Sequence, residues 1–168
     1  MPNPCCPPDH RDAIDERYGA AALEQEVCLC AAVPFDPALL AAIPKEVVSR
    51  DYGCGDPTRW VRPGDRVLDL GSGSGKNAFI CSQLVGAEGS VLGLDRNPNM
   101  LELANSACGS VASQIGYGNV SFRRAEIDQL AEDLDGQPLL ADGCIDVVLS
   151  NCVWNLVQPS RRAQLREA

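Results

Sequence analysis

The sequence predicts an α/β fold with a doubly wound, mainly parallel sheet, and we expect this sheet to be truncated after its fourth strand. Short apolar segments that are typical of buried strands alternate with segments of helical periodicity. The first strand leads directly into a run of closely spaced glycines, and a helix follows this run. Strands that alternate with helices pair in parallel through right-handed crossovers, and this rule gives the fold class.

The predicted strands and helices follow one another at short intervals. The expected strands are residues 67–70, 91–95, 120–123 and 145–150. One helix is expected between the glycine run and Gly86. The next begins at Asn97-Pro98, because asparagine caps a helix and proline favours its first turn. The fourth strand segment is mostly apolar, which is typical of a buried parallel strand.

We divide the chain into two regions, residues 1–60 and residues 61–168. The first is expected to be a helical extension that carries cysteines, and the second an incomplete sheet domain. Apolar positions at helical spacing predict a helix over residues 11–27. Capping signals predict further helix over residues 36–50, and the glycine that follows places residues 52–55 on a loop.

The composition narrows the possible partners. The 168 residues carry a formal net charge of -9, which repels a polyanion, so we expect no nucleic-acid partner. No apolar run approaches the roughly 20 residues that a membrane span needs. The first ten residues also lack the basic and apolar parts of a secretory signal, so we expect a cytoplasmic protein with no membrane partner. Because the cytoplasm keeps thiols reduced, the nine cysteines suggest thiol chemistry rather than disulfides.

The glycine run at residues 71–75 predicts a loop that lets a nucleotide-like ligand approach the backbone at the start of a helix. We reject a phosphate-binding P-loop, because Asn77 stands where the magnesium-binding hydroxyl belongs and Leu70 stands where the first glycine belongs. A dinucleotide fingerprint needs a small residue where Lys76 stands, which disfavours a nicotinamide cofactor.

The spacing that remains is Asp-x-Gly-x-Gly-x-Gly, formed by Asp69, Gly71, Gly73 and Gly75. It resembles the first motif of class I S-adenosylmethionine-dependent methyltransferases, and the resemblance extends from Val67 to Ser150. The resemblance implies a Rossmann-like class I methyltransferase fold that binds S-adenosylmethionine as its cofactor. Asp95 ends the second strand, where an acidic side chain can accept hydrogen bonds from both hydroxyls of a ribose.

The same resemblance implies further contacts to the cofactor. Ile127 and Asp128 come after the third strand, where the family packs the adenine ring and accepts a hydrogen bond from its amino group. Met100 is expected to cover the other face of the purine. We also expect Tyr52 and Gly53, on the loop before the first strand, to contact the cofactor.

Four cysteines lie in segments that the fold brings towards the cofactor: Cys28, Cys30, Cys54 and Cys152. Cys152 follows the fourth strand, and ligands of open parallel sheets bind at the carboxyl ends of the strands. His10 is the only histidine and no Cys-x-x-Cys pair occurs, so any metal or metalloid site would consist of thiolates. The other cysteines of the sheet domain are expected to pack as small apolar residues: Cys81, Cys108 and Cys144.

Three segments closely resemble the arsenite methyltransferase family. They are Tyr-Gly-Cys-Gly at 52–55, Leu-Asp-Leu-Gly-Ser-Gly-Ser-Gly at 68–75 and Ser-Asn-Cys-Val-Trp-Asn-Leu-Val at 150–157. In that family a trio of cysteines binds trivalent arsenic, and the resemblance transfers this role to Cys54 and Cys152. The third ligand corresponds to Cys30 or Cys28, and we favour Cys30.

This resemblance implies methyl transfer from S-adenosylmethionine to arsenite or methylarsenite held by cysteine thiolates, with an external thiol as reductant. Thiolates are soft ligands that suit trivalent arsenic, and they leave its lone pair free as a nucleophile. Two alternatives stay open: a methyltransferase for another small molecule, and a truncated, non-catalytic thiol binder of arsenic or a soft metal. Class I methyltransferases usually have seven strands, so a sheet of four would expose an apolar edge through which the chain could self-associate.

Overall fold

The computed structural model describes residues 35–153 and Val157. The helix predicted over residues 11–27 and the candidate ligands Cys28 and Cys30 lie outside the described residues. The elements are α2 (Pro37–Ala41), α3 (Lys45–Ser49), the 3-10 helix η1 (Thr58–Trp60), β1 (Arg66–Leu70), α4 (Lys76–Val85), β2 (Ser90–Asp95), α5 (Pro98–Ile115), β3 (Val120–Arg124) and β4 (Val147–Ser150). The alternation of strands and helices confirms the predicted α/β class.

The four strands form one parallel sheet in the order β3-β2-β1-β4. Leu68 of β1 is paired with Leu92 of β2 on one side and with Val148 of β4 on the other. Arg66 also forms an ion pair with Asp146 (Nε to Oδ2, 2.9 Å), which fastens the start of β4 to the start of β1. This order confirms the predicted Rossmann-like sheet and puts the carboxyl ends of all four strands at one edge.

The expectation that the fourth strand is buried is wrong. Its apolar sequence predicted a buried strand over residues 145–150, but β4 begins only at Val147 and Leu149 is its sole buried residue. Val148 is 57% exposed. The reason is tertiary: among the described strands, β4 has a hydrogen-bonded neighbour on one side only, whereas β1 and β2 have neighbours on both.

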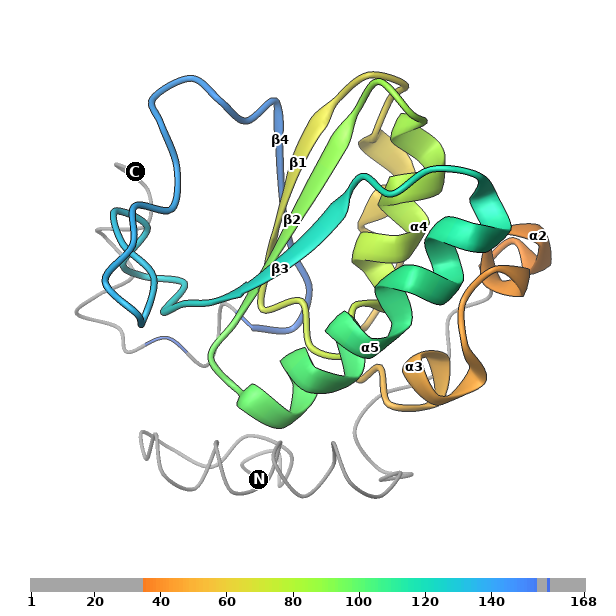
Figure 1. The fold of residues 1–168 in the computed structure, drawn as a ribbon, viewed down its shortest axis with the longest axis horizontal. Helices are drawn as coiled ribbons and strands as arrows, with labels where there is room; N and C mark the ends of the chain where they lie inside the picture. Colours follow the sequence, from red (N-terminus) through yellow and green to blue (C-terminus); the bar gives the residue numbers. More distant parts are fainter. Residues whose placement is uncertain (1–34, 154–156, 158–168) are drawn as a thin grey trace, which may run out of the picture.

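Helices α4 and α5 cover one face of the sheet (Figure 1). Alternate strand residues point towards them, and Val67 and Val91 form the larger apolar core together with Phe79 of α4. Phe79 packs edge-on against Phe122 of β3, with ring centroids 5.4 Å apart. The core therefore fixes the position of α4, whose first turn borders the functional pocket described below.

The opposite face carries the other set of strand side chains, including Leu68, Leu70 and Leu94. The segment between β3 and β4 folds over this face (Figure 1) and buries Leu139 there. In the described part of the chain, this loop covers only part of the face and leaves Val148 exposed, whereas α4 and α5 cover the other face.

The residues before β1 pack onto the sheet domain. Asp36 caps α2, since its Oδ1 accepts a hydrogen bond from Ala38 N at 2.9 Å, and this confirms the predicted start signal. Val47 of α3 is fully buried in the larger core. Its carbonyl accepts a hydrogen bond from Ser74 Oγ at 2.8 Å, so α3 lies beside the glycine loop. The division of the chain at residue 60 stays a prediction.

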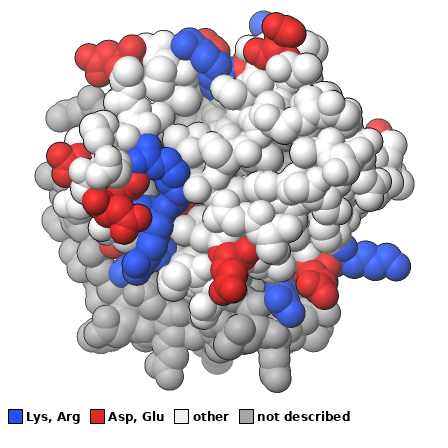
Figure 2. Space-filling model, viewed as in Figure 1, with Lys and Arg blue, Asp and Glu red and all other residues white. Residues whose placement is uncertain are grey.

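The surface in Figure 2 shows basic side chains lying beside acidic ones rather than in a patch of their own. Two ion pairs are examples of such neighbours: Arg123 with Asp133, and Arg96 with Glu126 at 3.7 Å. Basic and acidic side chains are therefore interspersed among the described residues of this face. No helix within residues 35–153 is long and apolar enough to cross a membrane.

Candidate functional site

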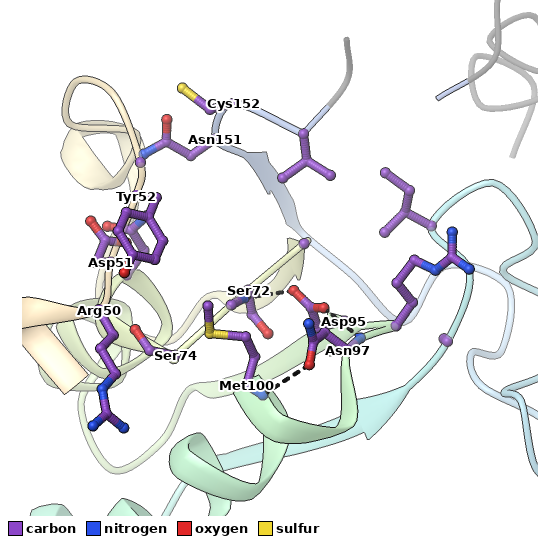
Figure 3. Close-up of a pocket in the computed structure, with 18 of the residues that line it drawn as sticks. Arg50, Asp51, Tyr52, Ser72, Ser74, Asp95, Asn97, Met100, Asn151 and Cys152 are labelled. Atoms are coloured by element: carbon purple, nitrogen blue, oxygen red, sulfur yellow. Dashed lines mark hydrogen bonds between the residues drawn. The ribbon is translucent and has the colours of Figure 1, made fainter. Parts of the chain in front are cut away.

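A pocket opens at the edge of the sheet where the parallel strands end (Figure 3). The loops after all four strands contribute to its walls, together with residues 50–53. Most of the predicted site residues line it, namely Tyr52, Gly53, Gly71, Gly73, Asp95, Met100, Ile127, Asp128 and Cys152. Asp69, Gly75 and Cys54 lie near the pocket but outside its lining. Cys28 and Cys30 lie outside the described residues.

The loop after β1 depends on glycines with left-handed backbone conformations. Gly71 has φ +74° and Gly73 has φ +53°, values that other residues rarely adopt. A Cβ atom on Gly71 would lie 2.4 Å from Val153 Cγ2, whereas a Cβ atom on Gly73 would meet no atom within 4 Å. Gly71 therefore allows the segment after β4 to pack against the loop, and Gly73 leaves open space at the pocket wall.

Asp95 holds the glycine loop and the start of α5 in place. Its carboxylate accepts one hydrogen bond from Gly73 N and another from Asn97 N, both at 2.8 Å. A carboxylate offers about four acceptor positions, so it can still accept hydrogen bonds from a ligand with two hydroxyls. Burial raises the pKa of Asp95, and the backbone N–H donors oppose this rise.

Asp69 and Gly75 do not line the pocket but lie next to the glycine loop. Asp69 is 2% exposed, and its Oδ2 has no hydrogen-bond partner among the described residues. Burial raises its pKa to about 7, with smaller contributions from the carboxyl groups of Asp51 and Asp95. A Cβ atom on Gly75 would lie 2.7 Å from Phe122 Cζ, so the absence of a side chain there serves packing.

Two further polar side chains on the pocket wall have no internal partner. Ser72 Oγ and Asn77 Oδ1 are buried and lack a hydrogen-bond partner within the part of the chain that the structure describes. Leaving such groups unpaired costs about 1–3 kcal/mol each. The start of α4 at Lys76 also borders this wall, and the N–H groups of a helix's first turn have no partner within the helix. The wall is therefore suited to a polar ligand that would satisfy these groups.

The residues predicted to hold an adenine ring meet at the same pocket. Met100 lies in the first turn of α5, which Asn97 caps by accepting hydrogen bonds from Asn99 N and Met100 N. Ile127 and Asp128 follow β3 and line the pocket as well. The pocket thus combines apolar side chains with an acidic acceptor, as recognition of a purine requires.

The two predicted thiol ligands come from segments that the structure brings into contact. Cys152 lines the pocket, and its φ of +59° is unusual for a residue other than glycine. Cys54 is exposed, and its N–H donates a hydrogen bond to Asn151 Oδ1 at 2.9 Å. No group of three histidine, cysteine or acidic side chains in residues 35–153 is arranged to bind a metal ion.

The three cysteines that were predicted to be structural do not line the pocket. Cys81 is buried in the larger core and Cys108 is partly buried on α5. Burial raises the pKa of both thiols, which opposes thiolate formation. Cys144 precedes β4, is partly buried and is not part of the pocket lining.

Two residues that shape the site, Asp51 and Asn151, were not among the predicted site residues. Asp51 forms an ion pair with Lys76, and the two side chains are only 12% and 10% exposed. Lys76 Nζ also lies 4.3 Å from the centre of the Phe35 ring. This ion pair fastens the chain before Cys54 to the start of α4. Asn151 fastens Cys54 itself, and its position next to Cys152 was the only signal that could have identified it.

Comparisons with known proteins agree with this geometry. A model of the methyltransferase domain family matches residues 62–164. Arsenite methyltransferase from Aquipseudomonas alcaligenes is 47% identical over 130 residues, which cover 77% of this chain and 36% of that protein. Arsenite methyltransferase from Rattus norvegicus is 35% identical over 168 residues, covering 94% of this chain and 44% of the relative.

A solved structure shows the same likeness. The crystal structure of an arsenic(III) S-adenosylmethionine methyltransferase from Chlamydomonas reinhardtii matches this fold with a TM-score of 0.68 and 41% sequence identity. The match covers 80% of this chain and 45% of that one. The chain thus spans less than half the length of these relatives. The matched domain, the glycine loop and the sheet order together show that this chain belongs to the methyltransferase domain family, and the relatives named above are arsenite methyltransferases.

Proposed function

We propose that this chain transfers a methyl group from S-adenosylmethionine to trivalent arsenic, supplied as arsenite or methylarsenite and held by cysteine thiolates. One observation carries the proposal. The wall of the pocket that contains Asp95 and the glycine loop also contains Cys152, and the hydrogen bond from Cys54 N to Asn151 brings a second thiol segment to the same edge. The relatives described above are named for this activity.

The residues of the pocket fit S-adenosylmethionine. Asp95 would accept hydrogen bonds from its ribose hydroxyls, and Asp128 would accept one from the adenine amino group, with Met100 and Ile127 against the ring. Gly73 leaves space for the ligand at the wall, and Ser72 Oγ and Asn77 Oδ1 offer it unsatisfied polar atoms. When bound, S-adenosylmethionine supplies an electrophilic methyl group on a positively charged sulfur.

The thiols would bind the arsenic substrate by exchange. Arsenite, As(OH)₃, reacts with three thiols to form As(SR)₃ and three water molecules, so the net charge of the site does not change. Three thiolates leave the arsenic lone pair available as the nucleophile, and no general base is needed. We assign two of the thiols to Cys54 and Cys152, and the third to Cys30 or alternatively Cys28.

We also propose that turnover needs an external thiol reductant. A methyl group that arrives without its bonding electrons takes up the arsenic lone pair, which formally oxidises arsenic from +3 to +5. Return to the trivalent state needs two electrons, which two thiols supply as they join in a disulfide. The reductant therefore belongs to the class of small or protein thiols.

The binding half of this proposal is tested by titrating the reduced protein with arsenite and following tryptophan fluorescence. Trp154 lies two residues from Cys152 in the sequence. We expect a saturable change at about one equivalent that is lost in Cys54→Ser and in Cys152→Ser. It should persist in the control Cys108→Ser, whose thiol lies on α5. Comparison of Cys28→Ser with Cys30→Ser identifies the third thiol.

The catalytic half is tested by incubating the protein with labelled S-adenosylmethionine, arsenite and an excess of thiol. Methylated arsenic that depends on Cys54 and Cys152 would support the proposal. If the cofactor binds but arsenite does not, the chain is a methyltransferase for another small molecule. If arsenite binds but the cofactor does not, the chain is a thiol binder without transferase activity.

A further inference from the structure

Asn151 stands between the two thiol-bearing segments of the site (Figure 3). It precedes Cys152 in the chain and extends from the end of β4 towards the segment that contains Tyr52. Its Oδ1 accepts the hydrogen bond from Cys54 N at 2.9 Å, a contact between residues 97 positions apart. The Asn151 side chain thus connects the backbone of Cys54 to the residue directly before Cys152.

This contact fixes the orientation of the Asn151 amide. An N–H donor needs an oxygen acceptor, so Oδ1 faces Cys54 N and Nδ2 lies on the other side of the amide. A Cβ atom on Gly53 would lie 2.4 Å from Nδ2 and 3.0 Å from Cγ. The amide therefore fits only because residue 53 has no side chain. This close approach gives Gly53 a role besides lining the pocket.

The segment around Cys54 is held by side chains from distant parts of the chain. Residues 51–54 belong to no helix or strand, and Cys54 itself is exposed. The ion pair between Asp51 and Lys76 holds the beginning of this segment, three residues before Cys54. The hydrogen bond to Asn151 acts at the backbone of Cys54. Its loss would weaken the attachment of this backbone to the segment that carries Cys152.

We propose that Asn151 is a positioning residue, which holds the Cys54 segment against Cys152 so that the two thiols meet one arsenic atom. This inference rests on the proposed function, because it assigns both thiols to one substrate. Asn151 acts through the backbone of Cys54 and not by binding arsenic. Holding the two thiols in place before arsenic arrives lowers the ordering cost of binding, and so raises the affinity.

The first test compares arsenite affinity in the full chain and its Asn151→Ala variant by the fluorescence titration. A neutral hydrogen bond contributes about 0.5–1.5 kcal/mol, so the arsenite Kd should rise by roughly 2- to 13-fold. Asn151→Asp keeps an oxygen acceptor in the same place and should restore most of the affinity. Asn105→Ala, the same change on the exposed side of α5, should leave the Kd unaltered. Thermal unfolding of each variant reports separately on folding.

The second test uses Gly53. In the natural background, Gly53→Ala displaces the Asn151 amide and should raise the arsenite Kd to a similar extent. In the Asn151→Ala background the amide is gone, so Gly53→Ala should add little. A purely structural role would instead give additive losses.

The outcomes separate this inference from the proposed function. If the natural chain binds arsenite and Asn151→Ala binds it equally well, the inference is wrong while the proposed function stands. Equal effects of Gly53→Ala in both backgrounds would overturn the inference in the same way. If the natural chain does not bind arsenite, the proposed function fails and the inference fails with it.

Discussion

Gly73 offers the sharpest test of the cofactor pocket, because a side chain added at this position would point into open space. Its φ of +53° and the absence of any atom within 4 Å of a Cβ mean that an alanine side chain would enter the pocket without striking the protein. Gly116, at the end of α5, has φ +89° and equally open surroundings, but it lies outside the pocket. Gly116→Ala is therefore a matched control for backbone strain.

The two substitutions should cost the fold similar free energies. A left-handed alanine costs roughly 1–2 kcal/mol, and the smaller freedom of alanine in the unfolded chain offsets about 0.4–1 kcal/mol. A net loss of about 1 kcal/mol should lower Tm by roughly 2–4 °C in both variants. Only Gly73→Ala also places a methyl group against the ligand. Overpacking of this kind costs typically 1–3 kcal/mol, which weakens cofactor affinity by about 5- to 150-fold.

The assay is calorimetric titration of each variant with S-adenosylhomocysteine, together with thermal unfolding. We expect equal losses of Tm in the two variants, and a loss of affinity in Gly73→Ala alone. Natural affinity in a folded Gly73→Ala would show that the ligand does not lie against this glycine. Equal losses of affinity in both variants would show that strain, and not contact with the ligand, controls binding.

Three other predictions concern stability. Because burial raises the pKa of Asp69 to about 7, the folded state keeps a proton that the unfolded chain releases near pH 4. Stability should therefore fall as pH rises, by roughly 3 kcal/mol between pH 5 and pH 8 in urea unfolding, and clearly less in Asp69→Asn. Lys76→Met strands the mostly buried carboxylate of Asp51 and should cost about 3–5 kcal/mol; adding Asp51→Asn should recover part of this loss, whereas a further decrease would contradict the ion-pair argument. The free energy of unfolding, measured with urea, should be about 1 kcal/mol higher for Cys152→Gly than for Cys152→Ser, because glycine tolerates φ +59°. The opposite order would show that this backbone is unstrained.

Local patterns were enough to predict much of the fold. Asn97 and Pro98 mark the start of α5, and the run of apolar residues before Asp69 marks β1, because capping and strand signals act between neighbouring residues. Nine of the predicted site residues line the pocket. Several of them were assigned from the family resemblance, and those that directly follow strands meet there because a parallel sheet gathers these positions at one edge.

Contacts between segments that are distant in the sequence could not be predicted from local patterns. The apolar sequence of β4 predicted burial, yet Val148 is exposed, because the composition of a strand does not determine its place in the sheet. Likewise, Lys76 is a charged residue at a helix start, and its burial depends on Asp51 and Phe35, which lie far from it in the sequence. Such pairings have no local signature.

The sequence by itself therefore determined the order of the elements, the glycine loop, the acidic acceptor at Asp95 and the presence of thiols near the end of β4. Only the tertiary structure decided that Cys152 lies on the pocket wall, that Asp69 lies beneath it, and that Asn151 connects Cys54 to the same edge. The physical reason is distance along the chain: capping, turns and periodicity involve residues within a few positions, whereas the bond from Cys54 to Asn151 spans 97.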